Sequence, residues 1–120
     1  MKKDQQEQYT YEFGEYGGFA GTKTIKSLDK EGRVFQLLPS ISGTDSVLLG
    51  QLADSSRENL STLTVKALKI EGIKEVGNMN AYLKIYRNDS LLKEHEWPLG
   101  KKDLPTEIRN LYDLINGIKK

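Results

Sequence analysis

Four glycines fall within the eight residues Gly14–Gly21, directly after the run Tyr9–Phe13, in which aromatic residues occupy every second position. Such alternation is typical of a strand that buries one face. Glycine reaches positive φ without a steric penalty, so the cluster indicates a specific and unusual backbone path that holds Tyr16 and Phe19. Two interpretations stay open: a bulged hairpin connection that packs Phe19 into the core, or a rigid loop that presents Tyr16 or Phe19 to a partner.

The composition is that of one domain without disulfides. The chain has 120 residues, no cysteine and 37% apolar residues. A domain of this size buries roughly two-thirds of its unfolded surface and can fold without covalent cross-links. Lys and Arg number 18 against 17 Asp and Glu, a net charge of +1, which argues against a dedicated nucleic-acid or anionic-membrane surface. No apolar run approaches the ~20 residues of a transmembrane span.

The N-terminal half predicts strands joined by short connections. Three strands are expected, at Gln8–Phe13, Thr22–Leu28 and Arg33–Leu38. The last two are joined by a turn at Asp29–Gly32, where glycine supplies positive φ. Pro39 is expected to end the third strand, and Ser40–Thr44 to form a polar loop. Ser46–Leu52 fits either a helical turn or a short buried strand, because periodicity does not separate the two in so short an apolar run.

A helix is predicted over Ser56–Ile70. Ser55 and Glu58 have the spacing of a capping box, and Gly72 marks the expected end. The apolar positions at helical spacing are Leu60, Leu63, Ala67 and Ile70.

A β-hairpin and a second helix complete the chain. The strands Asn80–Arg87 and Ser90–Trp97 are expected to pair around a tight turn at Asn88-Asp89. Within the first of these strands Ala81, Leu83 and Ile85 share one face, and Tyr82, Lys84 and Tyr86 share the other. The final helix is led by Pro105, and its apolar stripe consists of Ile108, Leu111, Tyr112, Ile115 and Ile118.

The predicted order is therefore ββ(β)αββα. We expect an α+β fold with an antiparallel sheet of four to five strands and two helices packed on one face. Residues 8–120 would form this single domain. The polar residues 1–7 are interpreted as a flexible tether, with a frayed N-terminus as the alternative.

No catalytic constellation is recognisable, so we expect no enzyme, no metal site and no cofactor. His95 is the only histidine, and a zinc site or a Ser-His-Asp triad would each need more partners than the sequence offers. The carboxylate pairs Asp29/Glu31 and Asp54/Glu58 fall in a turn and at a helix start, where solvated charge is usual. The glycine cluster also lacks the spacing of a phosphate-binding loop.

The tyrosines suggest a second surface. Tyr82 and Tyr86 are expected to share a face and could join Tyr9 and Tyr11 in an aromatic patch. That patch would either bind a partner or lie under the helices. Trp97 is interpreted as a core residue.

The segment Tyr16-Gly17-Gly18-Phe19-Ala20-Gly21 resembles the glycine-rich signature near the start of emfourin-type domains. The best-understood members of that family are small protein inhibitors of thermolysin-like zinc metalloproteases. A first strand leading into the loop, a central helix, a hairpin and a proline-led helix follow in a similar order here. The resemblance implies a partner-binding role for Tyr16, Gly17, Gly18, Phe19, Ala20 and Gly21. The chain departs from the family in the extra turn and strand of Asp29–Gly43.

A second similarity covers the C-terminal half. Gly77–Leu83, Trp97 and the pattern from Leu104-Pro105 to Leu111-Tyr112 are similar to small uncharacterised lipoproteins of Bacteroidetes-type bacteria. This similarity implies a lipid-anchored domain in the cell envelope, in the periplasm or at the cell surface, if a leader peptide has been removed. Without such a removal, a cytoplasmic location is expected.

Three functions follow as hypotheses. The first is a non-enzymatic binding domain that inhibits a metalloprotease. The second is an envelope lipoprotein domain with a structural or accessory role. The third is a small enzyme that uses carboxylates or tyrosines, which would require a deep polar pocket. The partner and the oligomeric state are left open.

Overall fold

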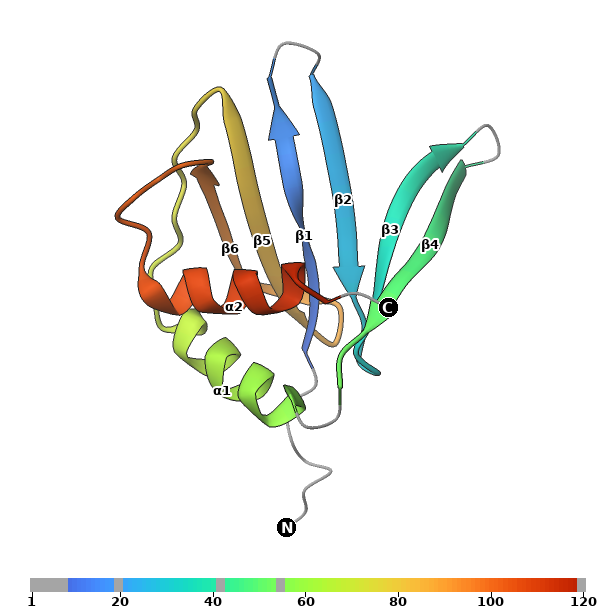
Figure 1. Ribbon diagram of the computed structural model, residues 1–120. Coiled ribbons are helices and arrows are strands. Elements are labelled where there is room, and N and C mark those ends of the chain that lie inside the picture. Colours follow the sequence, from blue (N-terminus) through green and yellow to red (C-terminus); the bar gives the residue numbers. More distant parts are fainter. Residues whose placement is uncertain (1–8, 19–20, 41–42, 54–55, 119–120) are drawn as a thin grey trace.

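A computed structural model describes residues 9–18, 21–40, 43–53 and 56–118. Within these ranges the chain folds into one six-stranded antiparallel sheet and two helices (Figure 1). The strands are β1 (Tyr9–Gly17), β2 (Thr22–Leu28), β3 (Arg33–Ser40), β4 (Gly43–Gln51), β5 (Met79–Arg87) and β6 (Ser90–Pro98). The helices are α1 (Arg57–Leu68) and α2 (Thr106–Asn116). The α+β class is thus confirmed, as is the antiparallel sheet.

The strand order in the sheet is β4-β3-β2-β1-β5-β6. Along the chain, β2, β3 and β4 are added one after another on one side of β1. Helix α1 then connects β4 to the β5–β6 hairpin, which lies on the other side of β1. The first strand is therefore central, and β1 pairs with β5 without a register shift over Tyr9–Gly17. This register decides which face of the sheet each side chain of β1 and β5 occupies.

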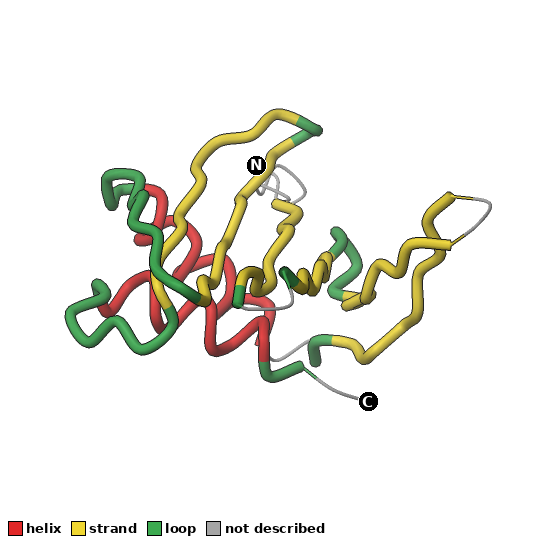
Figure 2. The backbone as a smooth tube through the Cα atoms, turned by 90° about the horizontal axis from the view of Figure 1, so that it is seen from above, coloured by secondary structure: helices red, strands yellow, loops and turns green. Residues whose placement is uncertain are grey.

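Both helices lie on the same face of the sheet, over β6, β5 and β1, while β3 and β4 extend beyond them as an arm (Figures 1 and 2). The core lies between the helices and this part of the sheet. Its fully buried side chains include Phe13, Leu83, Ile85, Ile108 and Ile115. The predicted stripe of α2 is confirmed, because Ile108, Leu111, Tyr112 and Ile115 are buried and Ile118 packs against them.

The prediction of four to five strands is too low. The sixth strand is β4, which takes up part of the expected polar loop and most of the ambiguous segment Ser46–Leu52. Its apolar residues lie outside the cover of the helices, and Val47 and Leu48 are 45% and 41% exposed on opposite faces. Burial on alternate positions, the usual mark of a strand, is therefore missing.

Pro39 does not end β3, which continues to Ser40 and pairs with β4 through Pro39↔Thr44. The pairing of β2 with β3 stops at Leu37. Beyond it β3 has a neighbour on one side only, which is the kind of position where a strand tolerates proline.

Helix α1 is shorter than predicted. It ends at Leu68, and the amides of Lys69 and Ile70 bond back to carbonyls three residues earlier. Gly72 is therefore not its cap. The chain leaves the helix early because Ile73 and Glu75 form backbone hydrogen bonds with Glu96 of β6.

The predicted capping box cannot be followed in the described residues. Ser55 lies outside the described residues, and Ser56 occupies the N-cap without a side-chain hydrogen bond. The expected tether, residues 1–7, also lies outside them.

The Asn88-Asp89 turn is confirmed by φ values of 52° and 69°, which are those of a type I′ hairpin. No helix in the described ranges is both long enough and apolar enough to cross a membrane.

Candidate functional site

The glycine cluster connects β1 to β2, and its described residues adopt the unusual backbone path that the sequence predicts. Gly17, Gly18 and Gly21 have φ values of 113°, 84° and 63°. The Gly21 amide donates to the Gly18 carbonyl at 3.1 Å, which closes a turn. Phe19 and Ala20 lie outside the described residues, so the choice between a core and a partner-facing Phe19 stays a prediction.

The first half of this connection is anchored to the segment before β5. The Gly18 amide donates to the Asn78 carbonyl at 2.8 Å. A Cβ on Gly17 would lie 2.4 Å from the same carbonyl oxygen, so only glycine allows this approach. The neighbouring turn is itself braced, because the buried Asn80 side chain accepts from the Gly77 amide at 2.7 Å and donates to the Gly77 carbonyl at 3.1 Å. The backbone at Gly17 and Gly18 is thereby fixed.

Tyr16 is fixed by its side chain. It lies on the face of the sheet opposite the helices, which we call the open face. Its hydroxyl donates a hydrogen bond to the Glu96 carboxylate on β6. That bond, with the nearby Glu96 and Glu94 charges, raises the pKa of Tyr16 to about 12. The phenol is therefore protonated at neutral pH.

Tyr82 lies beside Tyr16 on the open face, with ring centroids 6.3 Å apart. It pairs across the sheet with Gly14, and an added Cβ there would lie 3.3 Å from the Tyr82 ring. The same Cβ would lie 1.9 Å from the Thr24 carbonyl oxygen, so the close approach of β2 is the main reason for glycine at this position. The Tyr82 side chain is only 4% exposed although no helix covers it. Its hydroxyl donates to Glu12 at 2.9 Å, and burial together with this bond raises its pKa.

Charged side chains surround the two rings. The ammonium groups of Lys23 and Lys84 lie 5.6 Å and 5.8 Å from the centroid of the Tyr82 ring, which is within cation–π range. Together these side chains line a cavity of about 280 Å³ that we call the Tyr16–Tyr82 hollow. Its lining consists of Tyr16, Lys23, Tyr82, Lys84, Glu94 and Glu96.

The hollow combines two phenols, two ammonium groups and two carboxylates. Its two phenols have raised pKa values, so neither is poised as a base near pH 7. Among the described residues, no group of three or more His, Asp or Glu side chains is placed to hold a metal ion. Its ammonium groups come from β2 and β5 and its carboxylates from β6, so charges of both signs lie within one small site.

His95 is a core residue. It is fully buried on the helix face of β6, and its Nδ1 accepts a hydrogen bond from the Ile73 amide at 3.2 Å. Burial lowers its pKa to about 4, with a smaller contribution from Lys93, while the Ala67 backbone opposes the shift. The imidazole is therefore neutral at pH 7, in keeping with the structural role expected for it.

The predicted aromatic patch is not formed. Tyr9 and Tyr11 lie on the helix face of β1, where they pack against the core, whereas Tyr82 and Tyr86 lie on the open face. The register separates them, because Tyr9 and Tyr11 are cross-strand partners of Arg87 and Ile85 rather than of the two tyrosines. Trp97, as expected, belongs to the core.

Sequence reasoning missed most of the side chains around Tyr16. The structure adds Glu12, Lys23, Tyr82, Lys84 and Glu96 to the neighbourhood of the glycine connection. Alternation within β5 does place Tyr82 and Lys84 on one face. The hairpin register pairs Tyr82 with Glu96, and the separate pairing of β1 with β5 brings Tyr16 to both of them.

Comparison with known proteins adds no assignment. No protein-family model matches the chain, and no curated protein matches it significantly.

Proposed function

We propose that this chain is a non-enzymatic protein-binding domain whose contact surface is the Tyr16–Gly21 connection together with the Tyr16–Tyr82 hollow. The observation that carries the proposal is the way in which the start of the connection is held. Backbone hydrogen bonding fixes Gly18 to Asn78, and the Tyr16 hydroxyl bonds to Glu96.

This anchoring matters because association must offset the entropy lost when a binding loop becomes ordered. A segment that is already rigid loses less on binding and so retains more of its interaction energy. Gly21 has open space around its Cα, since an added Cβ would meet no atom within 4 Å. The end of the connection is therefore accessible to a partner.

The proposed partner is a thermolysin-like zinc metalloprotease. This choice rests on the resemblance of Tyr16-Gly17-Gly18-Phe19-Ala20-Gly21 to the emfourin-type signature. A rigid segment suits a protease inhibitor, because it can fill a cleft without adopting the geometry needed for cleavage. Aromatic side chains on such a segment are common anchors in protein interfaces.

The raised pKa values of Tyr16 and Tyr82 favour binding over catalysis. The carboxylates of Glu96 and Glu12 are occupied by these phenols.

The test is a titration of the purified domain into a thermolysin-like zinc protease, with peptide hydrolysis as the readout and a serine protease as the control. We expect saturable inhibition of the metalloprotease alone. Phe19→Ala should weaken inhibition at least about tenfold if it truncates an interface anchor. Tyr86→Ala, on the same sheet face but outside the hollow, is the matched control and should leave inhibition unchanged.

Thermal unfolding of each variant completes the test. Wild-type stability in Phe19→Ala together with lost inhibition supports an interface role. An unfolded Phe19→Ala would identify Phe19 as a core residue and remove the main support for the interface. Absence of inhibition by the folded wild-type domain would overturn the choice of partner.

A further inference from the structure

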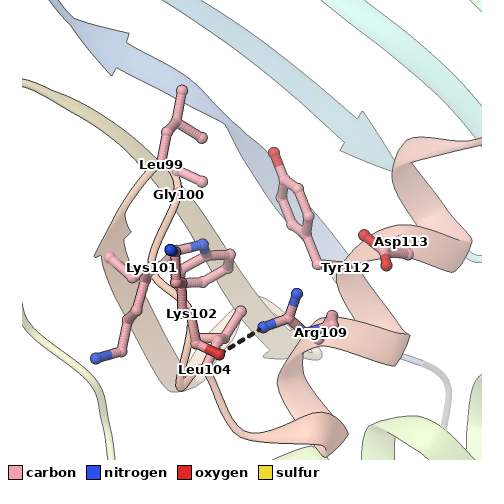
Figure 3. Close-up of a pocket in the computed structure, with 10 residues that line it drawn as sticks. Leu99, Gly100, Lys101, Lys102, Leu104, Arg109, Tyr112 and Asp113 are labelled. Carbon is pink, nitrogen blue, oxygen red and sulfur yellow. Dashed lines mark hydrogen bonds between the residues drawn. The ribbon is translucent and has the colours of Figure 1, made fainter.

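A second cavity, of about 410 Å³, lies between α2 and the connection that leads into it from β6 (Figure 3). It shares no residue with the Tyr16–Tyr82 hollow. Its lining consists of Ala81, Trp97, Leu99, Gly100, Lys101, Lys102, Leu104, Arg109, Tyr112 and Asp113. The volume falls within the ~300–1,000 Å³ typical of small-molecule sites.

The inner part of this cavity is apolar and rigid. Trp97 of β6 and Tyr112 of α2 meet edge to face, with ring centroids 5.2 Å apart. Both rings are almost fully buried, so they form a fixed wall. Leu99 and Leu104 add aliphatic surface from the connection, and Leu99 is 41% exposed. A small ligand with an apolar body would gain contact area here.

The cationic side chains around the cavity differ in whether a carboxylate already pairs with them. Lys101 is already neutralised, because its ammonium group lies 3.0 Å from Glu75 and 2.8 Å from Asp103. Figure 3 shows its side chain turned away from Arg109. Among the described residues, neither Lys102 nor Arg109 has a carboxylate within ion-pair distance.

Arg109 is therefore the group most available to a ligand. Its Nη2 donates to the Lys102 carbonyl at 3.4 Å, which orients the guanidinium beside Tyr112 and leaves its other N–H groups free for a ligand (Figure 3). A guanidinium presents paired donors that match the two oxygens of a carboxylate. Asp113, one helical turn later, is the single acidic residue of the lining and opposes an anion.

From this arrangement we propose that the cavity binds a small organic carboxylate with an apolar body. The carboxylate would pair with Arg109, with Lys102 adding positive charge, and the apolar body would lie against Trp97, Leu99 and Leu104. This site is independent of the protein-binding surface proposed above.

The chain carries its own reporter for this test, because Trp97 is its single tryptophan and forms the wall of the cavity. Trp97 fluorescence is followed at low salt while 3-phenylpropionate is added to the full chain. Two matched probes carry the same ring with other end groups: 3-phenylpropan-1-ol is neutral and 3-phenylpropylamine is cationic. We expect a saturable change for the carboxylate, at concentrations at which the other two give little change.

Three exposed positions supply the variants. Arg109→Gln should weaken carboxylate binding at least about fivefold, because it removes a charge-assisted bidentate contact. Asp113→Asn should strengthen it about twofold by removing an opposing charge. Lys66→Gln, on the surface of α1 and outside the lining, removes one positive charge elsewhere and should leave the affinity unchanged.

Several results would overturn the proposal. Equal binding of the alcohol would mean that the apolar wall alone selects the ligand. Tighter binding of the amine, with the effects of Arg109→Gln and Asp113→Asn reversed in sign, would make the site one for cations. No saturable response to the carboxylate would exclude the site for this class of ligand.

Discussion

The Tyr16 hydroxyl donates to the Glu96 carboxylate across β5, so the end of the first strand is tied to the last strand of the sheet. Tyr82, the cross-strand partner of Glu96, lies beside Tyr16 and holds its ring in place. The Tyr16 side chain is therefore positioned by Tyr82 and Glu96, which lie at least 66 residues later in the chain. This link gives the first test of how rigid the proposed binding surface is.

Tyr16→Phe removes the link and leaves the ring. We expect the domain to remain folded and to lose roughly 0.5–1.5 kcal/mol of unfolding free energy, the usual net contribution of one hydrogen bond. Amide hydrogen exchange at Gly18 should become faster, because Tyr16 no longer steadies the backbone beside it. Tyr82→Phe, which breaks the bond to Glu12, is the control and should change Gly18 exchange less. Equal exchange in both variants would show that Tyr16 does not hold the connection.

Gly17 and Gly21 provide a matched pair for the backbone of the connection. Gly17→Ala would force a Cβ to within 2.4 Å of the Asn78 oxygen at a φ of 113°, whereas Gly21→Ala meets no atom within 4 Å at a φ of 63°. A left-handed residue costs alanine about 1–2 kcal/mol. We expect Gly21→Ala to cost about that much, and Gly17→Ala to cost roughly 2 kcal/mol more. Chemical denaturation measures both, and equal losses would contradict the observed anchoring to Asn78.

Tyr11 and Thr64 form a buried hydrogen bond of 2.6 Å between β1 and α1. Because Thr64 Oγ1 donates to the Leu60 carbonyl at 2.8 Å, the Tyr11 hydroxyl is the donor between the two side chains. Thr64→Val strands this hydroxyl in the core and should cost roughly 1–3 kcal/mol. Tyr11→Phe should cost less, about 0.5–1.5 kcal/mol. The double variant should lose less than the sum of the two, and strict additivity in denaturation would exclude the coupling.

The sequence predicted the elements whose burial is decided locally. The β5–β6 hairpin and α2 were correct because Ala81, Leu83 and Ile85, and the stripe from Ile108 onward, face a single core. At β4 the sequence left a helical turn and a buried strand open. The segment is a strand, but Val47 and Leu48 are exposed because they lie beyond the helices, and this depends on how far the sheet extends past them. Local patterns contain no information on that distance.

The candidate site was predictable to a similar degree. Glycine permits positive φ, so the cluster predicts an unusual backbone path, and Gly17, Gly18 and Gly21 adopt it. The charges around Tyr16 come from β2, β5 and β6, which are brought together by the order of strands in the sheet. Glu96 reaches Tyr16 across β5, because β1 pairs with β5 and β5 with β6 in registers that place Tyr16 beside Asn80 and Glu96 beside Tyr82. No spacing along the chain encodes that neighbourhood.

His95 predicts how the free energy of unfolding depends on pH. No other histidine contributes, because the chain has only one. Its folded pKa of about 4 lies below its ordinary value of 6.5, because burial disfavours the charged form. The unfolded chain therefore binds a proton more readily than the folded one between these values. The stabilising contribution of the neutral imidazole is complete above pH 6.5 and is lost as the pH falls toward 4.

We expect the free energy of unfolding to drop by about 2 kcal/mol between pH 7 and pH 5 through this group. His95→Asn retains an acceptor for the Ile73 amide but does not titrate. It should remove the slope in this interval, whatever its own stability at pH 7. Denaturation curves at a series of pH values measure the slope in both proteins. A slope that persists in His95→Asn would assign the pH dependence to other groups and contradict the buried, neutral His95 of this structure.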